Sequence, residues 1–251
     1  MTTGAGKARR RQADGFDTDA LAGTLDRGLA GLGLSLRPDQ CARLIGYLSL
    51  LVRWNGTYNL TAIRDPREML VQHLLDSLAV APMLDGCISP DATCVDVGAG
   101  AGLPGIPLAI AWTERRFVLV EPVGKKAAFL RQCVIELPLP NVQVENRRVE
   151  SMRLTDAPDL ILCRAFASLR DFARAIEPIA ASGTRVVAMK GTMPVDEMVA
   201  LEADHRWRVE SAQAIEVPGL DAARHLIHLA STLASDGQAD SSPNPFRASG
   251  A

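Results

Sequence analysis

The sequence lacks the signals that would assign a chain to a membrane, a secretory route or a metal site. None of its 251 residues belongs to an apolar run of about eighteen, so no membrane-spanning helix is expected. The basic N-terminal stretch is not followed by an apolar core, which argues against a secretory signal. The five cysteines are far apart and form no C-x-x-C pair, so neither a zinc site nor a disulfide framework is predicted. A reducing, cytoplasmic location is therefore expected.

A strong charge of either sign is also missing. The formal net charge is -2 at pH 7, so nucleic-acid binding would require a local basic surface. Such a surface is predicted within residues 115–190, where thirteen Lys and Arg stand against eight Asp and Glu. Any one of these charges could simply be solvated. The candidates for contacts with nucleic-acid phosphates are Lys125, Lys126, Arg131, Arg148 and Lys190.

What the sequence does contain begins with a helical N-terminal region, and polar tails lie at both ends of the chain. Apolar residues recur at three- and four-residue spacing within residues 17–88, which predicts a helical extension. The helices are expected to run from about residue 17 to 32, onward from Pro38, and from Pro66 to Leu78. The basic tail 1–16 and the Ser-, Asp- and Pro-containing tail 233–251 are expected to be disordered.

From residue 89 to 232 the pattern changes to strands that alternate with helices. This alternation predicts one α/β domain with a mostly parallel sheet and helices on both faces. Segments of helical length lie between most of the strands, among them Lys125–Leu137 and Leu169–Ser182. Two further strands flank a Pro-Gly pair and are expected to form a terminal antiparallel pair. The predicted strands cover residues 92–97, 117–121, 142–146, 159–163, 184–190, 207–213 and 224–230.

The strongest local signal is the glycine-rich stretch after the first predicted strand. Asp96 opens a D-x-G-x-G-x-G pattern whose glycines are Gly98, Gly100 and Gly102. Glycines in this place let the backbone turn sharply and approach a ligand closely. Glu121 ends the second predicted strand, where a carboxylate can accept hydrogen bonds from both ribose hydroxyls of an adenosine. Together these residues predict a site for a nucleoside cofactor.

Two cofactors fit this site. Gly100, Gly102 and Gly105 satisfy G-x-G-x-x-G, the dinucleotide fingerprint, so an NAD-dependent oxidoreductase is one alternative. The position of Asp96 and the two prolines within residues 102–107, which remodel the helix start, favour S-adenosylmethionine instead. A glycine turn without a ligand is a further alternative, and so is a non-catalytic RNA-binding protein that keeps this core.

A set of motifs in fixed order extends over roughly residues 20–230. These motifs are Trp54-Asn55, Tyr58–Thr61, Arg64–Pro66, His73, Leu75–Ser77, the glycine loop, Gly124–Lys126, Arg148–Glu150, Arg164–Leu169, Lys190-Gly191 and Arg224-His225. In order and spacing the chain resembles the RsmG (GidB) family, the bacterial 16S ribosomal RNA guanine-N7 methyltransferases. The resemblance implies a class I, Rossmann-like methyltransferase core with an N-terminal helical extension. It also implies S-adenosylmethionine as cofactor.

The resemblance also implies which residues form the site. It places cofactor contacts on Gly98, Leu103, Glu121, Val149, Glu150 and Arg164. The substrate is expected to be 16S ribosomal RNA within a small ribosomal subunit or its precursor, because the basic surface is modest. A monomer is expected.

Methyl transfer to guanine N7 makes few chemical demands. N7 carries an in-plane lone pair and loses no proton, so direct displacement requires positioning and alignment rather than a general base. No strictly catalytic side chain is therefore expected, and Arg164 and Phe166 are the positioning candidates. Arg164 could alternatively form a salt bridge, and Phe166 could stack on a flipped guanine or pack in the core. His73 and Asp76 lie three residues apart and are predicted to join the helical extension to the core.

Overall fold

The computed structural model describes residues 16–203 and 205–232. The predicted tails, 1–16 and 233–251, lie outside these residues apart from residue 16. Within the described ranges, no helix has the length and apolar character needed to cross a membrane.

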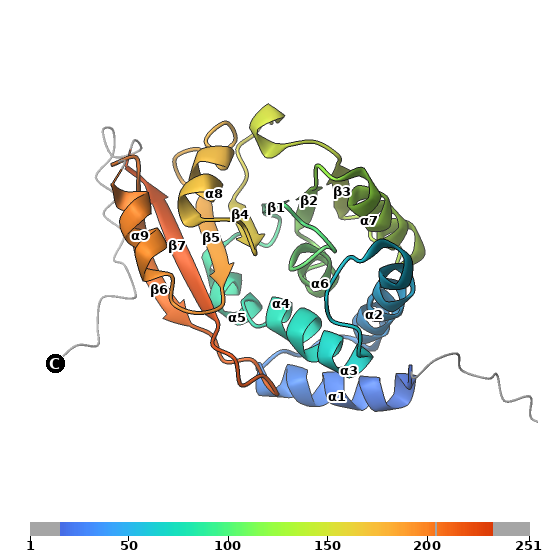
Figure 1. Cartoon of the computed structure of the whole chain (residues 1–251). Coiled ribbons are helices and arrows are strands. Elements are labelled where there is room, and N and C mark those ends of the chain that lie inside the picture. Colours follow the sequence, from blue (N-terminus) through green and yellow to red (C-terminus); the bar gives the residue numbers. More distant parts are fainter. Residues whose placement is uncertain (1–15, 204, 233–251) are drawn as a thin grey trace, which may run out of the picture.

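A seven-stranded sheet forms the centre of the molecule, with the strand order β3-β2-β1-β4-β5-β7-β6 (Figure 1). Strands β1 to β5 run parallel, and β7 lies antiparallel to both β5 and β6. The mostly parallel sheet and the terminal antiparallel pair are thus confirmed. The strands are β1 (Thr93–Val97), β2 (Arg116–Val120), β3 (Val142–Glu145), β4 (Leu160–Arg164), β5 (Arg185–Lys190), β6 (Trp207–Ala214) and β7 (His225–Ser231).

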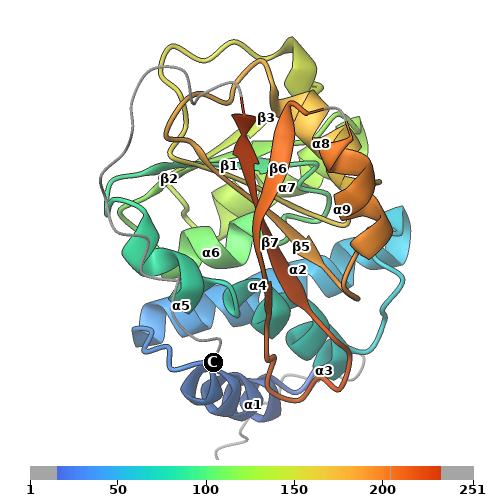
Figure 2. The same ribbon diagram turned by 90° about the vertical axis from the view of Figure 1, so that its left-hand side faces the viewer.

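Helices cover both faces of the sheet, as Figure 2 shows from the side. One face packs on α6 (Gly105–Ala111), α7 (Gly124–Glu136) and the N-terminal helices. The other packs on α8 (Leu169–Ile176), α9 (Val195–Glu202) and the 3-10 turn η3 (Val149–Ser151). Successive side chains of a strand point to opposite faces, and because both faces are covered, the central strands β1 and β4 are buried at almost every position.

The N-terminal region is helical, as predicted. Asp17 caps the first helix by accepting a hydrogen bond from the amide of Ala20, and Pro38 is the first residue of the second. The segment from Pro66 to Leu78 is helical throughout, with a π-helix in its middle. The elements are α1 (Thr18–Gly31), α2 (Pro38–Tyr58), α3 (Pro66–Met69), η1 (Leu70–Leu75), α4 (Asp76–Leu78), α5 (Ala81–Leu84) and η2 (Asp85–Cys87).

One predicted helix is shorter than expected. The pattern from Leu169 indicated a helix to about Ser182, but α8 ends at Ile176. Pro178 explains the difference, because a proline has no backbone N–H with which to continue the helical hydrogen bonds.

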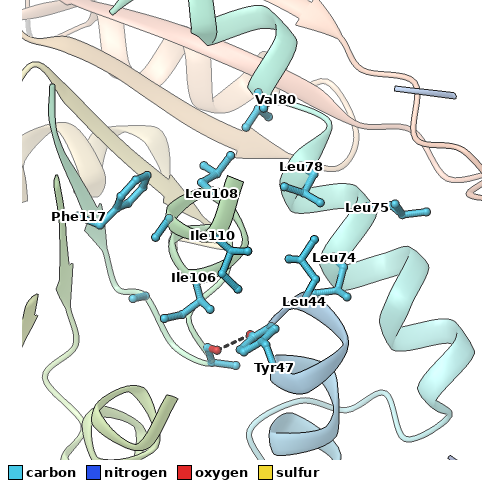
Figure 3. Close-up of a cluster of buried hydrophobic side chains, with 14 of the residues drawn as sticks. Leu44, Tyr47, Leu74, Leu75, Leu78, Val80, Ile106, Leu108, Ile110 and Phe117 are labelled. Carbon is cyan, nitrogen blue, oxygen red and sulfur yellow. Dashed lines mark hydrogen bonds between the residues drawn. The ribbon is translucent and has the colours of Figure 1, made fainter. Parts of the chain in front are cut away.

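A buried apolar cluster joins the N-terminal helices to the sheet (Figure 3). Its members come from α2, from the helix 66–78, from α6 and from β2, and they include Leu44, Leu74, Leu78, Ile106, Leu108, Ile110 and Phe117. Tyr47 of α2 lies in the same cluster and donates a hydrogen bond of 2.6 Å to the carbonyl of Ala101, in the loop after β1. The helical extension therefore supports the glycine loop directly.

Candidate functional site

The candidate site lies where the strand order reverses. β2 and β4 flank β1 on opposite sides, and the carboxyl ends of all three strands meet at one edge of the sheet. In open α/β sheets such a switch point forms the ligand-binding crevice. A pocket of about 250 Å³ opens here. It is lined by Leu60, Thr61, His73, Gly98, Ala99, Gly100, Ala101, Leu103, Lys126, Arg164 and Ala165.

The glycine loop forms one wall of the pocket. Gly98, Gly100 and Gly102 have φ angles of 69°, 60° and 87°, the left-handed region that favours glycine. A Cβ atom added to Gly98 would lie 3.7 Å from Cδ2 of Phe166. Glycine therefore keeps the space between the loop and this ring free of side chains. Such a backbone-lined cradle fits a nucleoside cofactor, which must approach the main chain closely.

Glu121 holds the glycine loop from the end of β2. Its Oε2 accepts a hydrogen bond of 2.8 Å from the amide of Gly100, and its Oε1 accepts one of 2.8 Å from the amide of Val123. Each carboxylate oxygen keeps a second lone pair, which remains available for a ribose hydroxyl. The side chain is only 3% exposed and is not among the residues that line the pocket, so Glu121 adjoins the pocket through its hydrogen bond to Gly100.

Asp96 supports the loop from within the core. Its side chain is 0% exposed, and its Oδ2 accepts a hydrogen bond of 2.9 Å from the amide of Gly105. The prediction of a direct cofactor contact is therefore corrected, because Asp96 presents no surface to the pocket. Burial raises the pKa of this carboxyl to about 7.

Asp96→Asn should change the pH dependence of stability. Because the pKa in the folded state is raised from 3.8 to about 7, the stability that protonation provides is complete below pH 3.8 and is lost as pH rises through about 7. The asparagine cannot ionise and escapes this loss. The free energy of unfolding of the variant, relative to that of the wild type, should therefore increase across this window by up to about 1.4 kcal/mol per pH unit. Urea unfolding from pH 5 to 8 measures this, and a constant difference between the two proteins would contradict it.

The second wall of the pocket is polar and comes mainly from the helical extension. Asn55 shapes the loop after α2, since its Oδ1 accepts from the amide of Thr61 at 2.9 Å and its Nδ2 donates to the carbonyl of Ile63 at 3.1 Å. The hydroxyl of Thr61 lies 2.8 Å from Nε2 of His73. Burial, with the nearby charge of Arg164, lowers the pKa of His73 to about 4. His73 is therefore neutral at pH 7.

Arg164 joins this wall to the sheet. The guanidinium forms an ion pair of 3.0 Å with Asp76 and donates a hydrogen bond of 3.1 Å to the carbonyl of Gln72, in the π-helix. Asp76 also accepts a hydrogen bond of 2.7 Å from Nε of Arg224. The predicted role of His73 and Asp76 in joining the helical extension to the core is confirmed. Arg164 both forms the salt bridge and lines the pocket.

Four other predicted residues, Gly102, Val149, Glu150 and Phe166, are also absent from the pocket lining. The half-buried ring of Phe166 faces Gly98 and packs on Phe172, with ring centroids 5.5 Å apart. Val149 is buried in the second core, and Glu150 is exposed next to it. Cys163 is fully enclosed and burial raises the pKa of its thiol well above the usual range, so it is not an accessible nucleophile.

The basic candidates fall into two groups. Lys126 lines the pocket, and Lys125, Arg131 and Arg148 are exposed. Lys190 differs from its prediction as an RNA contact, because its Nζ pairs with Glu197 at 2.7 Å and its side chain is only 11% exposed. Its charge is thus neutralised within the protein.

Tyr47→Phe tests the support that α2 gives to the glycine loop. Without the hydroxyl, the buried carbonyl of Ala101 loses its donor, and the free energy of unfolding should fall by about 1–3 kcal/mol. Ligand affinity should fall as well, because Ala101 lines the pocket. Urea unfolding measures the first effect. Tyr58→Phe is the matched control, since this exposed ring loses the same atom and should change stability little.

The fold and the pocket together define a class of protein, the class I S-adenosylmethionine-dependent methyltransferases. A solved structure of a SAM-dependent methyltransferase from Aquifex aeolicus superposes with a TM-score of 0.51 at 17% identity, covering 68% of this chain and 96% of that one. This likeness shows the fold.

Sequence comparison gives the family. The family model described as rRNA small subunit methyltransferase G matches residues 40–227. A ribosomal RNA small subunit methyltransferase G from Pseudomonas aeruginosa is 44% identical over 84% of this chain and 96% of its own length. One from Azoarcus sp. is 47% identical over 83% and 96%. The chain belongs to the rRNA small subunit methyltransferase G family, and the oxidoreductase and non-catalytic alternatives are not favoured.

Proposed function

We propose that the protein transfers a methyl group from S-adenosylmethionine to N7 of a guanine in 16S ribosomal RNA. The observation that carries this proposal is the pocket at the β1/β4 switch point, with a glycine wall on one side and a polar wall on the other. The glycine wall suits the cofactor, and the polar wall suits a nucleobase. Its two walls thus provide for both reactants.

The cofactor side consists of the glycine loop and the end of β2. Gly98, Gly100, Gly102 and Leu103 would contact the cofactor, and Glu121 would accept hydrogen bonds from its ribose hydroxyls. Val149 and Glu150 follow β3, the strand next to β2, and would contact the cofactor beyond the pocket lining. When bound, S-adenosylmethionine supplies an electrophilic methyl group on its sulfonium. Asp96 and Tyr47 hold the loop in the conformation that receives it.

The guanine side consists of Thr61, His73 and Arg164. Because N7 loses no proton, the side chains here need only to hold the base in line with the donor. The states of two titratable groups near the pocket agree with a reaction that transfers no proton. His73 is neutral at pH 7, and Asp96 is enclosed by the core. Arg164 carries a fixed charge and can donate to the O6 edge of guanine, which leaves N7 free.

The remaining features concern the substrate and the setting. Lys125, Lys126, Arg131 and Arg148 are the candidates for RNA phosphate contacts. We expect the RNA to be presented by a small ribosomal subunit or its precursor, the protein to act as a monomer, and the reaction to take place in the cytoplasm. Residues 17–88 would serve as the helical extension and residues 89–232 as the methyltransferase core.

Labelling of the RNA tests the proposed function. The purified protein is incubated with radiolabelled S-adenosylmethionine and small subunits that lack the modification, and labelled nucleosides are mapped by mass spectrometry. Label in 7-methylguanosine at a single site is the expected result. Naked 16S RNA, assayed in parallel, tests whether the particle is required. No label and no binding of S-adenosylmethionine, with measurable NAD binding, would overturn the proposal.

A further inference from the structure

An exposed aromatic ring lies at the rim of the pocket. Tyr58 is the last residue of α2 and is 38% exposed. Its ring stacks on Trp54, with centroids 5.1 Å apart and an angle of 29° between the planes. Trp54 in turn packs on the buried Phe129 of α7, with centroids 5.5 Å apart. Since Trp54 covers one face of the Tyr58 ring, the exposed area belongs to the other face and the edges.

The chain on both sides connects this ring to the pocket. Leu60, two residues after Tyr58, lines the pocket, and two residues span at most about 7 Å. From the opposite side, Nζ of Lys125 donates a hydrogen bond of 3.2 Å to the carbonyl of Tyr58, and its neighbour Lys126 lines the pocket. Arg64 is also exposed nearby, with a hydrogen bond of 3.2 Å to Oδ1 of Asn59. Two cations, Lys125 and Arg64, are therefore held at Tyr58 and at its neighbour Asn59.

We propose that Tyr58 stacks on the nucleobase that neighbours the target guanine. This inference rests on the proposed function, since it requires an RNA in the pocket. A guanine that enters the pocket leaves its stack, so the adjacent base loses a stacking partner. The outer face of Tyr58 replaces that partner, and Lys125 contacts the adjoining phosphate. An aromatic platform flanked by cations is the arrangement with which proteins bind single-stranded nucleic acid, and it accepts any base.

The backing by Trp54 makes the ring suited to this role. A free tyrosine side chain would lose rotamer freedom when a base stacks on it, whereas Tyr58 is already held by its contact with Trp54. The platform is thus formed before the RNA arrives. It would act on the affinity and alignment of the RNA and leave the cofactor site unchanged.

Tyr58→Leu and Tyr58→Trp test the platform. Leucine still covers Trp54 but has no π-face, while tryptophan keeps one. With small subunits that lack the modification, we expect Tyr58→Leu to lower kcat/KM about tenfold, mainly through KM, and Tyr58→Trp to stay near the wild type. Binding of S-adenosylmethionine should be equal in all three. Val199→Ala, at an apolar residue 68% exposed on α9, is the control for surface effects.

An abasic nucleotide identifies the partner of the ring. Small subunits that lack the modification are reconstituted from 16S RNA with and without the base next to the target guanine. The wild type should lose about tenfold in kcat/KM without that base, and Tyr58→Leu should be insensitive to it. Equal losses in both proteins, or a Tyr58→Trp variant as poor as Tyr58→Leu, would overturn the platform. If the wild type methylates no RNA at all, the proposed function itself fails.

Discussion

Gly98→Asp should lower the yield of 7-methylguanosine at least about hundredfold. Gly98 lines the pocket, and any Cβ there enters the space between the loop and Phe166. The aspartate would fill this space and place a negative charge in the glycine loop, two residues from Gly100, whose amide Glu121 binds. Label incorporation and equilibrium binding of S-adenosylmethionine measure the effect, and both should be lost together.

Gly33→Asp is the matched control for this substitution. Gly33 has a φ angle of 68°, against 69° for Gly98, so both variants impose the same backbone strain. A Cβ on Gly33 meets no atom within 4 Å. Gly33→Asp should therefore lose similar stability and keep its activity. If both variants lose activity alike, or if Gly98→Asp still methylates, then the glycine loop is not the cofactor wall.

Asp76→Asn should produce the largest loss of stability. Asp76 is 2% exposed and its carboxylate binds both Arg164 and Arg224. Its neutralisation leaves two partly buried guanidinium groups without their anion, which typically costs about 3–5 kcal/mol. The melting temperature should fall by roughly 6–20 °C. Activity should also be lower than that of the wild type at temperatures at which the variant is still folded, because Arg164 would lose the contact that orients it in the pocket.

Asp39→Asn controls for the loss of a carboxylate that two arginines share. Asp39 pairs with Arg37 at 3.1 Å and with Arg43 at 3.4 Å, but its side chain is 48% exposed. Solvent screens such pairs, so thermal unfolding of this variant should match the wild type. An equal shift in melting temperature for Asp76→Asn and Asp39→Asn would show that burial of the cluster contributes nothing.

Much of the fold was predictable because the spacing of apolar residues along the chain indicates which side chains of a helix or strand are buried. The spacing of apolar residues located α1, α2 and the helix 66–78, and β-branched runs located the strands. The glycine loop and Glu121 were also predictable, since strand ends in a parallel sheet meet at one edge. The end of α8 at Ile176 was missed, although Pro178 was a readable signal for it.

The polar wall of the pocket was only partly predictable. His73 and Arg164 stand 91 residues apart, and no spacing rule states that the π-helix would bring them within 3.3 Å. The bond from Tyr47 to Ala101 joins residues 54 apart and carries no motif. The pairing of Lys190 with Glu197 depends on how α9 packs. Such contacts are set by the tertiary arrangement, which local sequence patterns do not specify.

The carboxylate of Asp76 ties together three parts of the chain that the ribosome synthesises at different times. Of the three residues, Asp76 emerges first, Arg164 later, and Arg224 last, immediately before the strand β7 that pairs with β5. A growing chain can therefore form its N-terminal helices first, yet its polar wall waits for the C-terminal strand to dock. A chain that stops before Arg224 consequently lacks one of the two guanidinium groups that the buried carboxylate of Asp76 binds.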